Sequence, residues 1–269
     1  MNLYADSLKP LTVTDLLLMK QSGEKISCLT AYDASFSSLL DDVGIDALLV
    51  GDSLGMVIQG HSTTLPVTIT DMAYHCRHVA AARKRAFLIA DMPFASYATP
   101  EQALQTATRL MQEGMAQMVK LEGARADSIA FLVAQGIPVC GHLGLLPQSV
   151  NCLGGYKVQG REAGQAEAIL ADALKIEQAG AGLLVLECVP AQLAAEISVQ
   201  LRIPVIGIGA GPGCDGQVLV LYDMLNISMG KRPRFSKNFM SGAESIEDAI
   251  SCYHQAVKAG QFPLAEHSY

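Results

Sequence analysis

Short apolar segments recur along the chain, and longer polar or amphipathic segments separate them. In the apolar segments the hydrophobic residues run continuously rather than alternate with polar ones, which is typical of strands buried on both faces of a parallel sheet. We therefore predict eight strands, over residues 26–31, 46–51, 86–91, 117–121, 138–141, 182–187, 204–208 and 217–221.

The segments between these strands carry helix signals. In 99–114, Thr99 is suited to cap a helix that begins at Pro100. In 165–180, apolar residues repeat on one helical face, and Gly180 is suited to end the helix. Further helices are predicted over 71–84, 12–23 and 243–259.

Eight strand–helix units in about 250 residues match the size of a TIM (βα)8 barrel. The alternative is an open, doubly wound sheet, which usually carries a glycine-rich turn after its first strand. Here the first strand leads into residues 30–33, Thr-Ala-Tyr-Asp, which contain no glycine. We therefore predict an α/β fold with one barrel domain over residues 1–269, an N-terminal helix (12–23) across its bottom and a C-terminal helix (243–259) on its surface or at an interface.

Charged side chains gather at the carboxyl ends of the predicted strands. Parallel α/β folds build their active sites at this end of the sheet. The carboxylates, together with a lysine and a histidine, predict a pocket that holds a divalent metal and a base. The residues are Asp52, Asp91, Lys120, Glu122, His142 and Glu187.

Asp52 and Asp91 end neighbouring predicted strands, so their carboxylates can converge on one ion. A carboxylate at the end of an apolar strand is costly to bury unless it is paired or bound to a metal. Ligands that are all oxygen point to Mg²⁺ or a similarly hard cation. The alternative is that one or both cap the next helix or accept a hydrogen bond from a backbone N–H.

Lys120 and Glu122 point to the same face of their strand, because side chains alternate along a strand. One interpretation is a structural ion pair at the mouth of the barrel. The functional alternatives for Lys120 are a Schiff base with a carbonyl substrate and a permanent cation that holds a substrate carboxylate. The surrounding acids favour the charged form.

Glu187 follows an apolar run, and apolar neighbours raise the pKa of a carboxylate toward the range useful for proton transfer. The alternative is a glutamate at a helix N-terminus, because Pro190 soon follows.

His142 is either a catalytic group at the mouth or a plain hydrogen-bonding residue. The glycine-rich segment 151–161 is a candidate lid, and segment 207–216 is either a phosphate loop or, more simply, a tight turn.

Composition narrows the class of protein. Hydrophobic residues make up 50% of the 269 residues and the net charge is -7, which argues against a nucleic-acid partner. No apolar run reaches the roughly 18 residues of a membrane span, and residues 1–15 do not have the pattern of a secretory signal. Seven scattered cysteines without metal spacing are typical of thiols in a reducing compartment. We expect a cytoplasmic protein, and the apolar excess indicates subunit interfaces.

Six motifs resemble the ketopantoate hydroxymethyltransferase family, and the resemblance extends from about residue 11 to residue 240. The motifs are TAYDA (30–34), LLVGDSLGM (48–56), QGHSTTLPV (59–67), GHLGLLPQSV (141–150), GGYKVQGR (154–161) and GIGAG (207–211). The resemblance implies a Mg²⁺-dependent (βα)8 barrel that forms a large homo-oligomer, a decamer, in the cytoplasmic route to pantothenate and coenzyme A. It implies transfer of a hydroxymethyl group from 5,10-methylenetetrahydrofolate to 3-methyl-2-oxobutanoate through a Mg²⁺-stabilised enolate, giving ketopantoate (2-dehydropantoate).

The resemblance also implies a role for each site residue. Asp52 and Asp91 match the metal aspartates and Glu122 an acid beside the metal. Ser53, with Asp52, matches the contact to the carboxylate end of the substrate. The remaining matches are Lys120 with the lysine that binds the keto acid, His142 with a histidine close to the substrate, and Glu187 with the catalytic base. One departure is Ala124, where the family often has a second glycine.

Three other functions fit the same residues. A metal-dependent lyase or aldolase of the 2-oxo-acid barrel type would use Mg²⁺ without folate. A Schiff-base aldolase would act through Lys120 and would tolerate EDTA. A non-catalytic binding barrel is the third, and the expected burial of so many acids argues against it.

Overall fold

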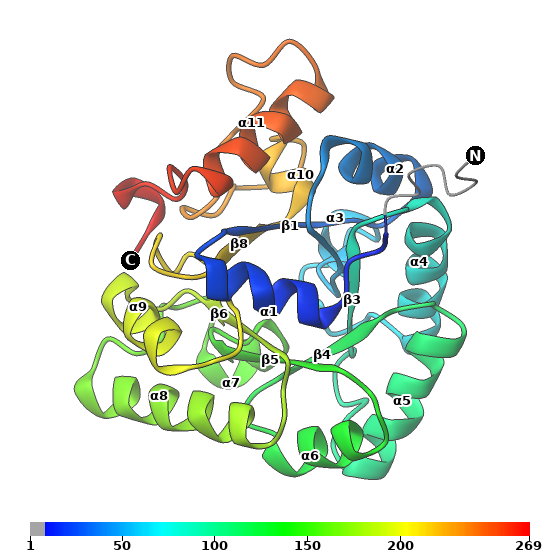
Figure 1. Ribbon diagram of the computed structural model, residues 1–269, viewed down its shortest axis with the longest axis vertical. Coiled ribbons are helices and arrows are strands. Elements are labelled where there is room, and N and C mark those ends of the chain that lie inside the picture. The colour runs from blue at the N-terminus through cyan, green and yellow to red at the C-terminus, as the bar shows by residue number, and fades with distance from the viewer. Residues whose placement is uncertain (1–8) are drawn as a thin grey trace, which may run out of the picture.

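The computed structural model describes residues 9–269, which form a closed barrel of eight parallel strands (Figure 1). The predicted TIM barrel is confirmed: each strand pairs with the next in the chain, and the last pairs with the first through Cys28 and Val218. Residues 1–8, which belong to the predicted domain and to the N-terminal segment judged not to be a signal, lie outside the described residues. The strands are β1 Ile26–Thr30, β2 Ala47–Val50, β3 Phe87–Asp91, β4 Met118–Glu122, β5 Val139–Gly144, β6 Leu183–Glu187, β7 Val205–Ile208 and β8 Gly216–Leu219.

Two predicted strand ends were wrong in ways that bear on the site. β5 continues to Gly144, three residues beyond the predicted end, because it pairs with β6 as far as Glu187. His142 is therefore part of a strand rather than of the loop after it. β8 ends before Leu221, whose backbone N–H leaves the ladder and donates to the Thr30 hydroxyl at 2.9 Å.

Helices surround the barrel, as Figure 1 shows. The predicted cap at Thr99 is confirmed, since its hydroxyl accepts from the backbone N–H of Gln102 and Pro100 is the first helical residue. The α-helices are α1 Val13–Ser22, α2 Ala34–Val43, α3 Leu54–Val57, α4 Ile69–Ala82, α5 Pro100–Gln112, α6 Ala126–Ala134, α7 Val150–Leu153, α8 Ala163–Gln178, α9 Ala191–Gln200, α10 Leu221–Met224 and α11 Ile246–Lys258. Two 3-10 helices are η1 Pro147–Ser149 and η2 Ala265–His267.

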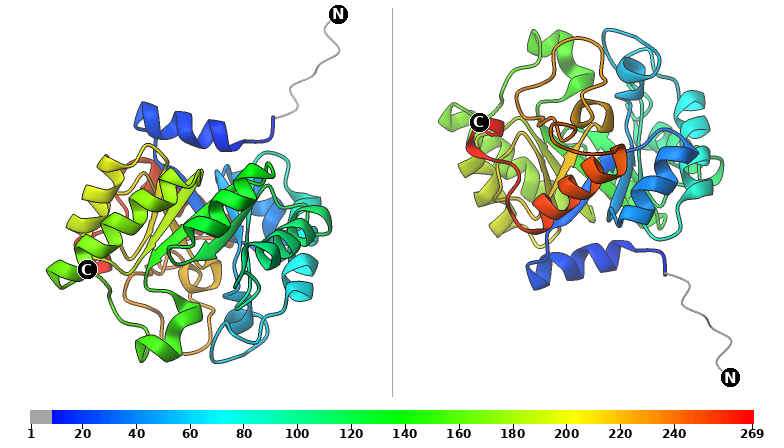
Figure 2. Two further views of the ribbon diagram at one scale, coloured as in Figure 1. Left: turned by 90° about the horizontal axis from the view of Figure 1, so that it is seen from below. Right: turned by 90° about the horizontal axis from the view of Figure 1, so that it is seen from above.

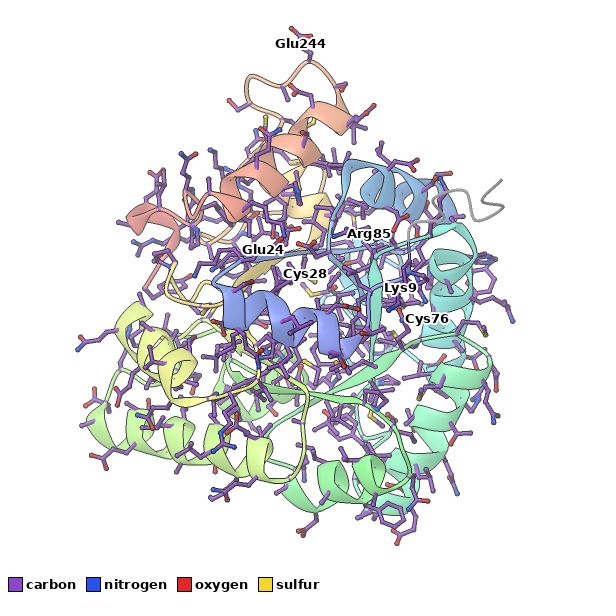
Figure 3. The ribbon with its side chains drawn as sticks, in the orientation of Figure 1. Lys9, Glu24, Cys28, Cys76, Arg85 and Glu244 are labelled. Atoms are coloured by element: carbon purple, nitrogen blue, oxygen red, sulfur yellow. The ribbon has the colours of Figure 1, made fainter. Side chains whose placement is uncertain are left out.

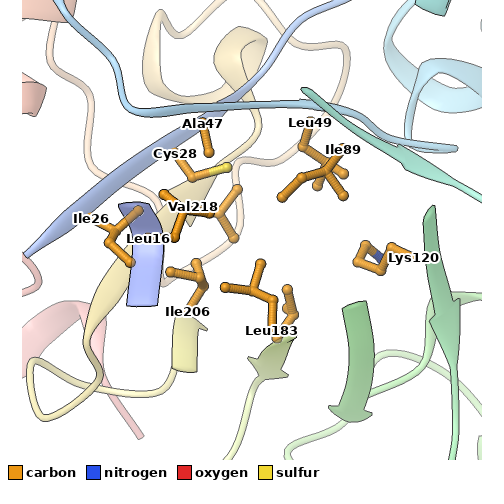
Figure 4. A pocket seen from close by; sticks show the side chains of 11 residues that line it. Leu16, Ile26, Cys28, Ala47, Leu49, Ile89, Lys120, Leu183, Ile206 and Val218 are labelled. Carbon is orange, nitrogen blue, oxygen red and sulfur yellow. The ribbon is translucent and has the colours of Figure 1, made fainter. Parts of the chain in front are cut away.

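The amino-terminal end of the barrel is closed by α1, as predicted. In Figure 2 this helix lies across one end of the barrel, opposite the long connecting loops. Leu16 of α1 is fully buried and lies among aliphatic side chains of the strands, and together with Lys120 they line a small void (Figure 4). The void left there is about 10 Å³, which at most matches one water molecule. Ligands therefore cannot reach the barrel interior from this side.

The C-terminal helix α11 is part of the barrel wall and packs against β1 and α2. Its Lys258 Nζ lies 2.7 Å from the buried Asp46 Oδ2 and 2.7 Å from Glu24 Oε1. Arg85 Nη2 approaches the other Asp46 oxygen at 2.8 Å; Arg85 and Glu24 are labelled in Figure 3. This ionic cluster fixes the last helix to the first strands, so α11 has a structural role besides any at an interface.

The described residues agree with the prediction of reduced cysteines. All seven cysteines are free, and Cys28, Cys140 and Cys188 are buried as expected. Within residues 9–269, no helix combines the length and the apolar character needed to cross a membrane.

Gly144 allows β5 to end against β6. Its φ is +92°, and an added Cβ would overlap the carbonyl oxygen of Glu187, to which the Leu145 N–H donates. We expect Gly144→Ala to lower the free energy of unfolding by about 3 kcal/mol or more, through backbone strain and this overlap. Chemical denaturation measures the change.

Gly136→Ala is the matched control for that experiment. Gly136 also has a positive φ, +80°, but nothing lies within 4 Å of its added Cβ. It should cost only the intrinsic strain of about 1 kcal/mol. Equal losses in the two variants would show that the contact with Glu187 is unimportant.

Candidate active site

A cavity of about 680 Å³ opens at the carboxyl ends of the strands, opposite α1. Every residue proposed for the site from the sequence lines this cavity, although the residues come from four strands, β3 to β6, and the turn after β2. They are Asp52, Ser53, Asp91, Lys120, Glu122, His142 and Glu187. The parallel topology therefore brings together side chains separated by up to 135 positions in the sequence.

The register of the strands sets which side chains are neighbours. Asp91 of β3 is the Cα partner of Lys120 of β4, and Glu122 is the partner of His142 of β5. Aligned residues of parallel strands point the same way. Two pairs of polar side chains, Asp91 with Lys120 and Glu122 with His142, therefore lie side by side at the barrel mouth.

Lys120 lies at the centre of the cluster and is 5% exposed. Its Nζ is 2.8 Å from Asp91 Oδ1 and 3.2 Å from His142 Nδ1. The ion pair considered for Glu122 is formed with Asp91 instead. Burial alone would lower the pKa of Lys120, but the carboxylates of Asp91, Glu122 and Asp52 raise it above its usual value. The amine is thus protonated, which favours a fixed cation and argues against a Schiff base.

Asp91 has two carboxylate oxygens with different surroundings. Oδ2 accepts a hydrogen bond from the backbone N–H of Asp52 at 3.1 Å, as the alternative interpretation of these aspartates expected. Oδ1 is buried and accepts no hydrogen bond from the described residues, although it faces the Lys120 ammonium.

Asp52 is buried beside Asp91. Burial, followed by repulsion from Asp91, raises the pKa of Asp52 to about 7, against the opposing effects of Lys120 and of a hydrogen bond from Gln148. Two buried carboxylates this close resist being ionised together. A cation between them would remove that penalty.

The donor set fits Mg²⁺. Mg²⁺ is commonly held by one or two carboxylates, with its other ligands supplied by substrate and water. Asp52 and Asp91 provide such a pair, since both carboxylates line the cavity and the repulsion between them raises the pKa of Asp52. Among residues 9–269 no group of three or more His, Cys, Asp or Glu side chains is arranged to hold a metal alone. Glu122 Oε2 is engaged by the backbone N–H of Gln148 at 3.1 Å.

His142 links Lys120 to Glu187. Burial and then Lys120 lower the pKa of His142 well below its usual value, so the ring is neutral. Since the lysine can only donate, Nδ1 accepts, and the ring proton resides on Nε2. Nε2 lies 3.2 Å from Glu187 Oε2, at an angle that does not make a hydrogen bond. Glu187 is therefore held near the imidazole without being locked to it.

The surroundings of Glu187 change its pKa. Burial raises the pKa of Glu187 to about 8, with Lys120 opposing the rise and Asp91 adding to it. Its side chain is 14% exposed and faces the cavity. Helix α9 begins at Ala191 with Pro190 as its N-cap residue, so Glu187 does not cap a helix. The next residue, Cys188, has a φ of +48°, a strained conformation of the kind that clusters at functional sites.

Sequence reasoning missed Gln148, which holds the acids in place. Its amide nitrogen donates to Asp52 Oδ2 at 2.8 Å and to the carbonyl of Met92 at 2.9 Å. Its amide oxygen accepts from the Tyr97 hydroxyl at 2.5 Å. Gln148 and Tyr97 do not lie at the end of a strand, and the site residues were predicted only from strand ends. The only sequence signal for Gln148 was its place in the motif at 141–150.

Loops form the mouth of the cavity. The loops after β2, β5 and β8 gather at the end opposite α1 in Figure 2. They contribute apolar side chains such as Met56, Tyr156 and Met229, and the basic residues Lys231 and Arg232. The candidate lid 151–161 lies here through Tyr156. In segment 207–216, a Cβ on Gly211 would overlap Ala191, which agrees with a tight turn.

Known proteins resemble this chain over nearly its whole length. A family model described as ketopantoate hydroxymethyltransferase matches residues 10–265. The 3-methyl-2-oxobutanoate hydroxymethyltransferase of Nitrosococcus oceani is 60% identical over 96% of this chain and 99% of that protein. The protein of the same name from Alkalilimnicola ehrlichii is also 60% identical, over 97% of this chain and 95% of that protein.

Solved structures share the fold at low identity. Phosphoenolpyruvate phosphomutase from Streptomyces platensis subsp. rosaceus matches with a TM-score of 0.60 and 12% identity, over 80% of this chain and 83% of that one. A 2,3-dimethylmalate lyase of the PEP mutase/isocitrate lyase superfamily matches with a TM-score of 0.55 and 16% identity, over 77% and 80%. The fold is thus a TIM barrel of the kind seen in that superfamily. From the family model and the close relatives, this chain belongs to the ketopantoate hydroxymethyltransferase family and is a hydroxymethyl-transferring enzyme.

Proposed function

We propose that the enzyme transfers a hydroxymethyl group from 5,10-methylenetetrahydrofolate to 3-methyl-2-oxobutanoate and so forms ketopantoate for pantothenate and coenzyme A synthesis. One observation carries the proposal: Glu187, with its pKa raised to about 8, shares a cavity with the Lys120 cation and two carboxylates. Such a site is suited to removing a proton next to a carbonyl group.

The bottom of the cavity suits a 2-oxo acid. Lys120 supplies a buried positive charge for its oxygens, and Ser53 lies beside Asp52 with its hydroxyl 2.8 Å from that of Tyr32. Asp52 and Asp91 would hold Mg²⁺, with Glu122 beside it. When bound, Mg²⁺ would draw electron density from the keto oxygen and make the C3 proton more acidic.

Glu187 then acts as the base for C3. As a carboxylate it takes the proton, and the Nε2–H of His142, 3.2 Å from Glu187 Oε2, stabilises the negative charge that Glu187 carries before the transfer. Water adds to the methylene carbon of the folate, whose bonds to N5 and N10 break, so that tetrahydrofolate is released and the one-carbon unit is freed at the oxidation level of formaldehyde. C3 then forms the new bond to this carbon, and its oxygen takes up a proton to become the hydroxyl group of ketopantoate.

The experiment that tests this proposal follows 3-methyl-2-oxobutanoate by NMR in D₂O with enzyme and Mg²⁺. Without folate, deuterium should replace the C3 proton, and EDTA should stop the exchange. Added 5,10-methylenetetrahydrofolate should give ketopantoate. Exchange without product would indicate a lyase or aldolase that uses another acceptor, and the absence of any exchange would remove Glu187 as the base for this acid.

The pH dependence of the same exchange should report on Glu187. The base acts only when it is deprotonated, and its pKa is raised to about 8, so kcat/KM should rise with pH and level off above about 8. A profile already flat from pH 5 would contradict this assignment. Rates measured from pH 5 to 9.5 decide between the two results.

We also propose a cytoplasmic homo-oligomer, a decamer, on the basis of the family resemblance. Exposed apolar side chains, among them Tyr74, Phe94 and Met115, support a subunit interface. Sedimentation equilibrium gives the mass of the assembly, and a monomeric mass at all concentrations would disprove the proposal.

A further inference from the structure

A second, open pocket of about 400 Å³ lies beside the mouth of the catalytic cavity. Residues 226–236, which follow α10, form one wall, and Glu266 and His267 of η2 form the other. We call it the C-terminal basic pocket. Lys231, Arg232 and Arg234 line both this pocket and the catalytic cavity, so the two are continuous.

The charge of this pocket is opposite to that of the chain. The protein carries a net charge of -7, yet residues 231–237 hold four basic residues and no acid. Among the described residues, Glu266 is the single carboxylate that lines the pocket, and its side chain is 74% exposed. The local field therefore attracts anions.

Two buried polar atoms in the lining have no partner among the described residues. Ser236 is 3% exposed and its hydroxyl makes no hydrogen bond. His267 is 8% exposed and its Nδ1 makes none either. Buried polar groups are rarely left unpaired, because each costs about 1–3 kcal/mol. Both residues line the pocket, and an oxygen of a ligand bound there would accept a hydrogen bond from the Ser236 hydroxyl or from a proton on His267 Nδ1.

Neighbouring groups hold the arginines in place. Arg234 Nε donates to the carbonyl of Glu266 at 3.0 Å, and its guanidinium lies 5.4 Å from the ring centre of Tyr269. Arg232 Nη1 donates to Asn226 Oδ1 at 3.1 Å. Each guanidinium keeps further N–H donors, and a fixed planar fork matches a carboxylate.

We propose that the C-terminal basic pocket binds the carboxylate groups of a polyanionic ligand, namely the glutamate end of the folate co-substrate. The inference rests on the proposed function. The apolar side chains of the catalytic mouth suit the flat pterin, and the shared wall of Lys231, Arg232 and Arg234 leads from there into the pocket. A folate with several γ-linked glutamates would engage more of these donors than one with a single glutamate.

The test uses the full-length enzyme with Mg²⁺ and compares wild type with Arg232→Gln and Ser236→Ala. KM is measured for 5,10-methylenetetrahydrofolate with one and with three glutamates. Loss of a hydrogen bond to a charged group should raise KM for the triglutamate form about tenfold in Arg232→Gln, while Ser236→Ala gives a smaller rise. Lys175→Gln removes an exposed charge from α8 and should leave KM unchanged.

Two further measurements separate the possible outcomes. Deuterium exchange of the keto acid without folate shows whether each variant is folded and tests the proposed function independently. Calorimetric titration with tri-γ-glutamate and with inorganic phosphate measures the pocket without turnover. Unchanged KM values in a variant that still exchanges would overturn the proposal. Weaker phosphate binding with unchanged KM would also overturn it, in favour of a site for a free anion.

Discussion

Replacing Glu187 with glutamine should slow C3 exchange of 3-methyl-2-oxobutanoate by about 10²–10⁴-fold, the usual contribution of a general base. The amide is close in shape to the carboxylate and cannot accept the proton. Lys120 and the two aspartates are unaltered, so binding of the keto acid should persist. The exchange rate and the Kd for 3-methyl-2-oxobutanoate, measured on the same preparation, test the loss of catalysis and the retention of binding.

The thermal stability of the Glu187→Gln variant shows whether its loss of activity comes from misfolding. The pKa of Glu187 is raised from 4.5 to about 8 by burial, so the folded state disfavours the ionised form. Wild type therefore loses stability as pH rises from about 4.5 through 8, and glutamine, which does not ionise, avoids this loss. At pH 9 the inactive variant should have the higher Tm. Glu196→Gln, on the exposed side of α9, is the control and should change neither rate nor Tm; a Glu187→Gln variant that still exchanges at the wild-type rate would exclude Glu187 as the base.

Replacing Lys120 with methionine should lower the free energy of unfolding by about 3–5 kcal/mol at pH 9 in EDTA. Removing one partner of a buried ion pair leaves the other uncompensated, and Lys120 is the cation nearest to Asp91, at 2.8 Å. The loss should shrink as pH falls below about 7, because Asp52, whose pKa is raised to about 7, becomes neutral. Urea denaturation at pH 9 and pH 5.5 measures the difference, and keto-acid binding should be lost.

Lys175→Met provides the comparison for the lysine variant. Lys175 forms an exposed pair with Asp172 on α8 at 2.9 Å, and such pairs contribute at most about 0.5 kcal/mol. If Lys120→Met cost as little, or cost the same at both pH values, the cluster would not depend on the lysine charge.

Much of the fold and most of the site followed from local sequence patterns. Continuous apolar runs identify buried strands without any knowledge of tertiary contacts. Eight such strands that alternate with helices are compatible with only a few topologies. In a parallel barrel the carboxyl ends of all strands lie at the same end. The side chains of Asp52, Asp91 and Glu187 could therefore be predicted to share one site without any distance being known.

The features of the site that the sequence did not predict depend on contacts between segments that are distant in the chain. That Lys120 pairs with Asp91 rather than Glu122 follows from the register of β3 on β4. Gln148 reaches Asp52 only because η1 folds back over the strand ends. Ala124, the departure from the family pattern, is exposed, which explains why a methyl group is tolerated there. The unpaired atoms of Ser236 and His267 have no sequence signal.

The helix that seals the lower end of the barrel also constrains the kinetics. Because Leu16 fills that end, both substrates of the proposed reaction share one opening. In the proposed reaction, we therefore expect the small keto acid to bind before the larger pterin covers the cavity, and ketopantoate to leave after tetrahydrofolate. Excess folate that binds first should then act as a substrate inhibitor, which initial-rate kinetics would detect.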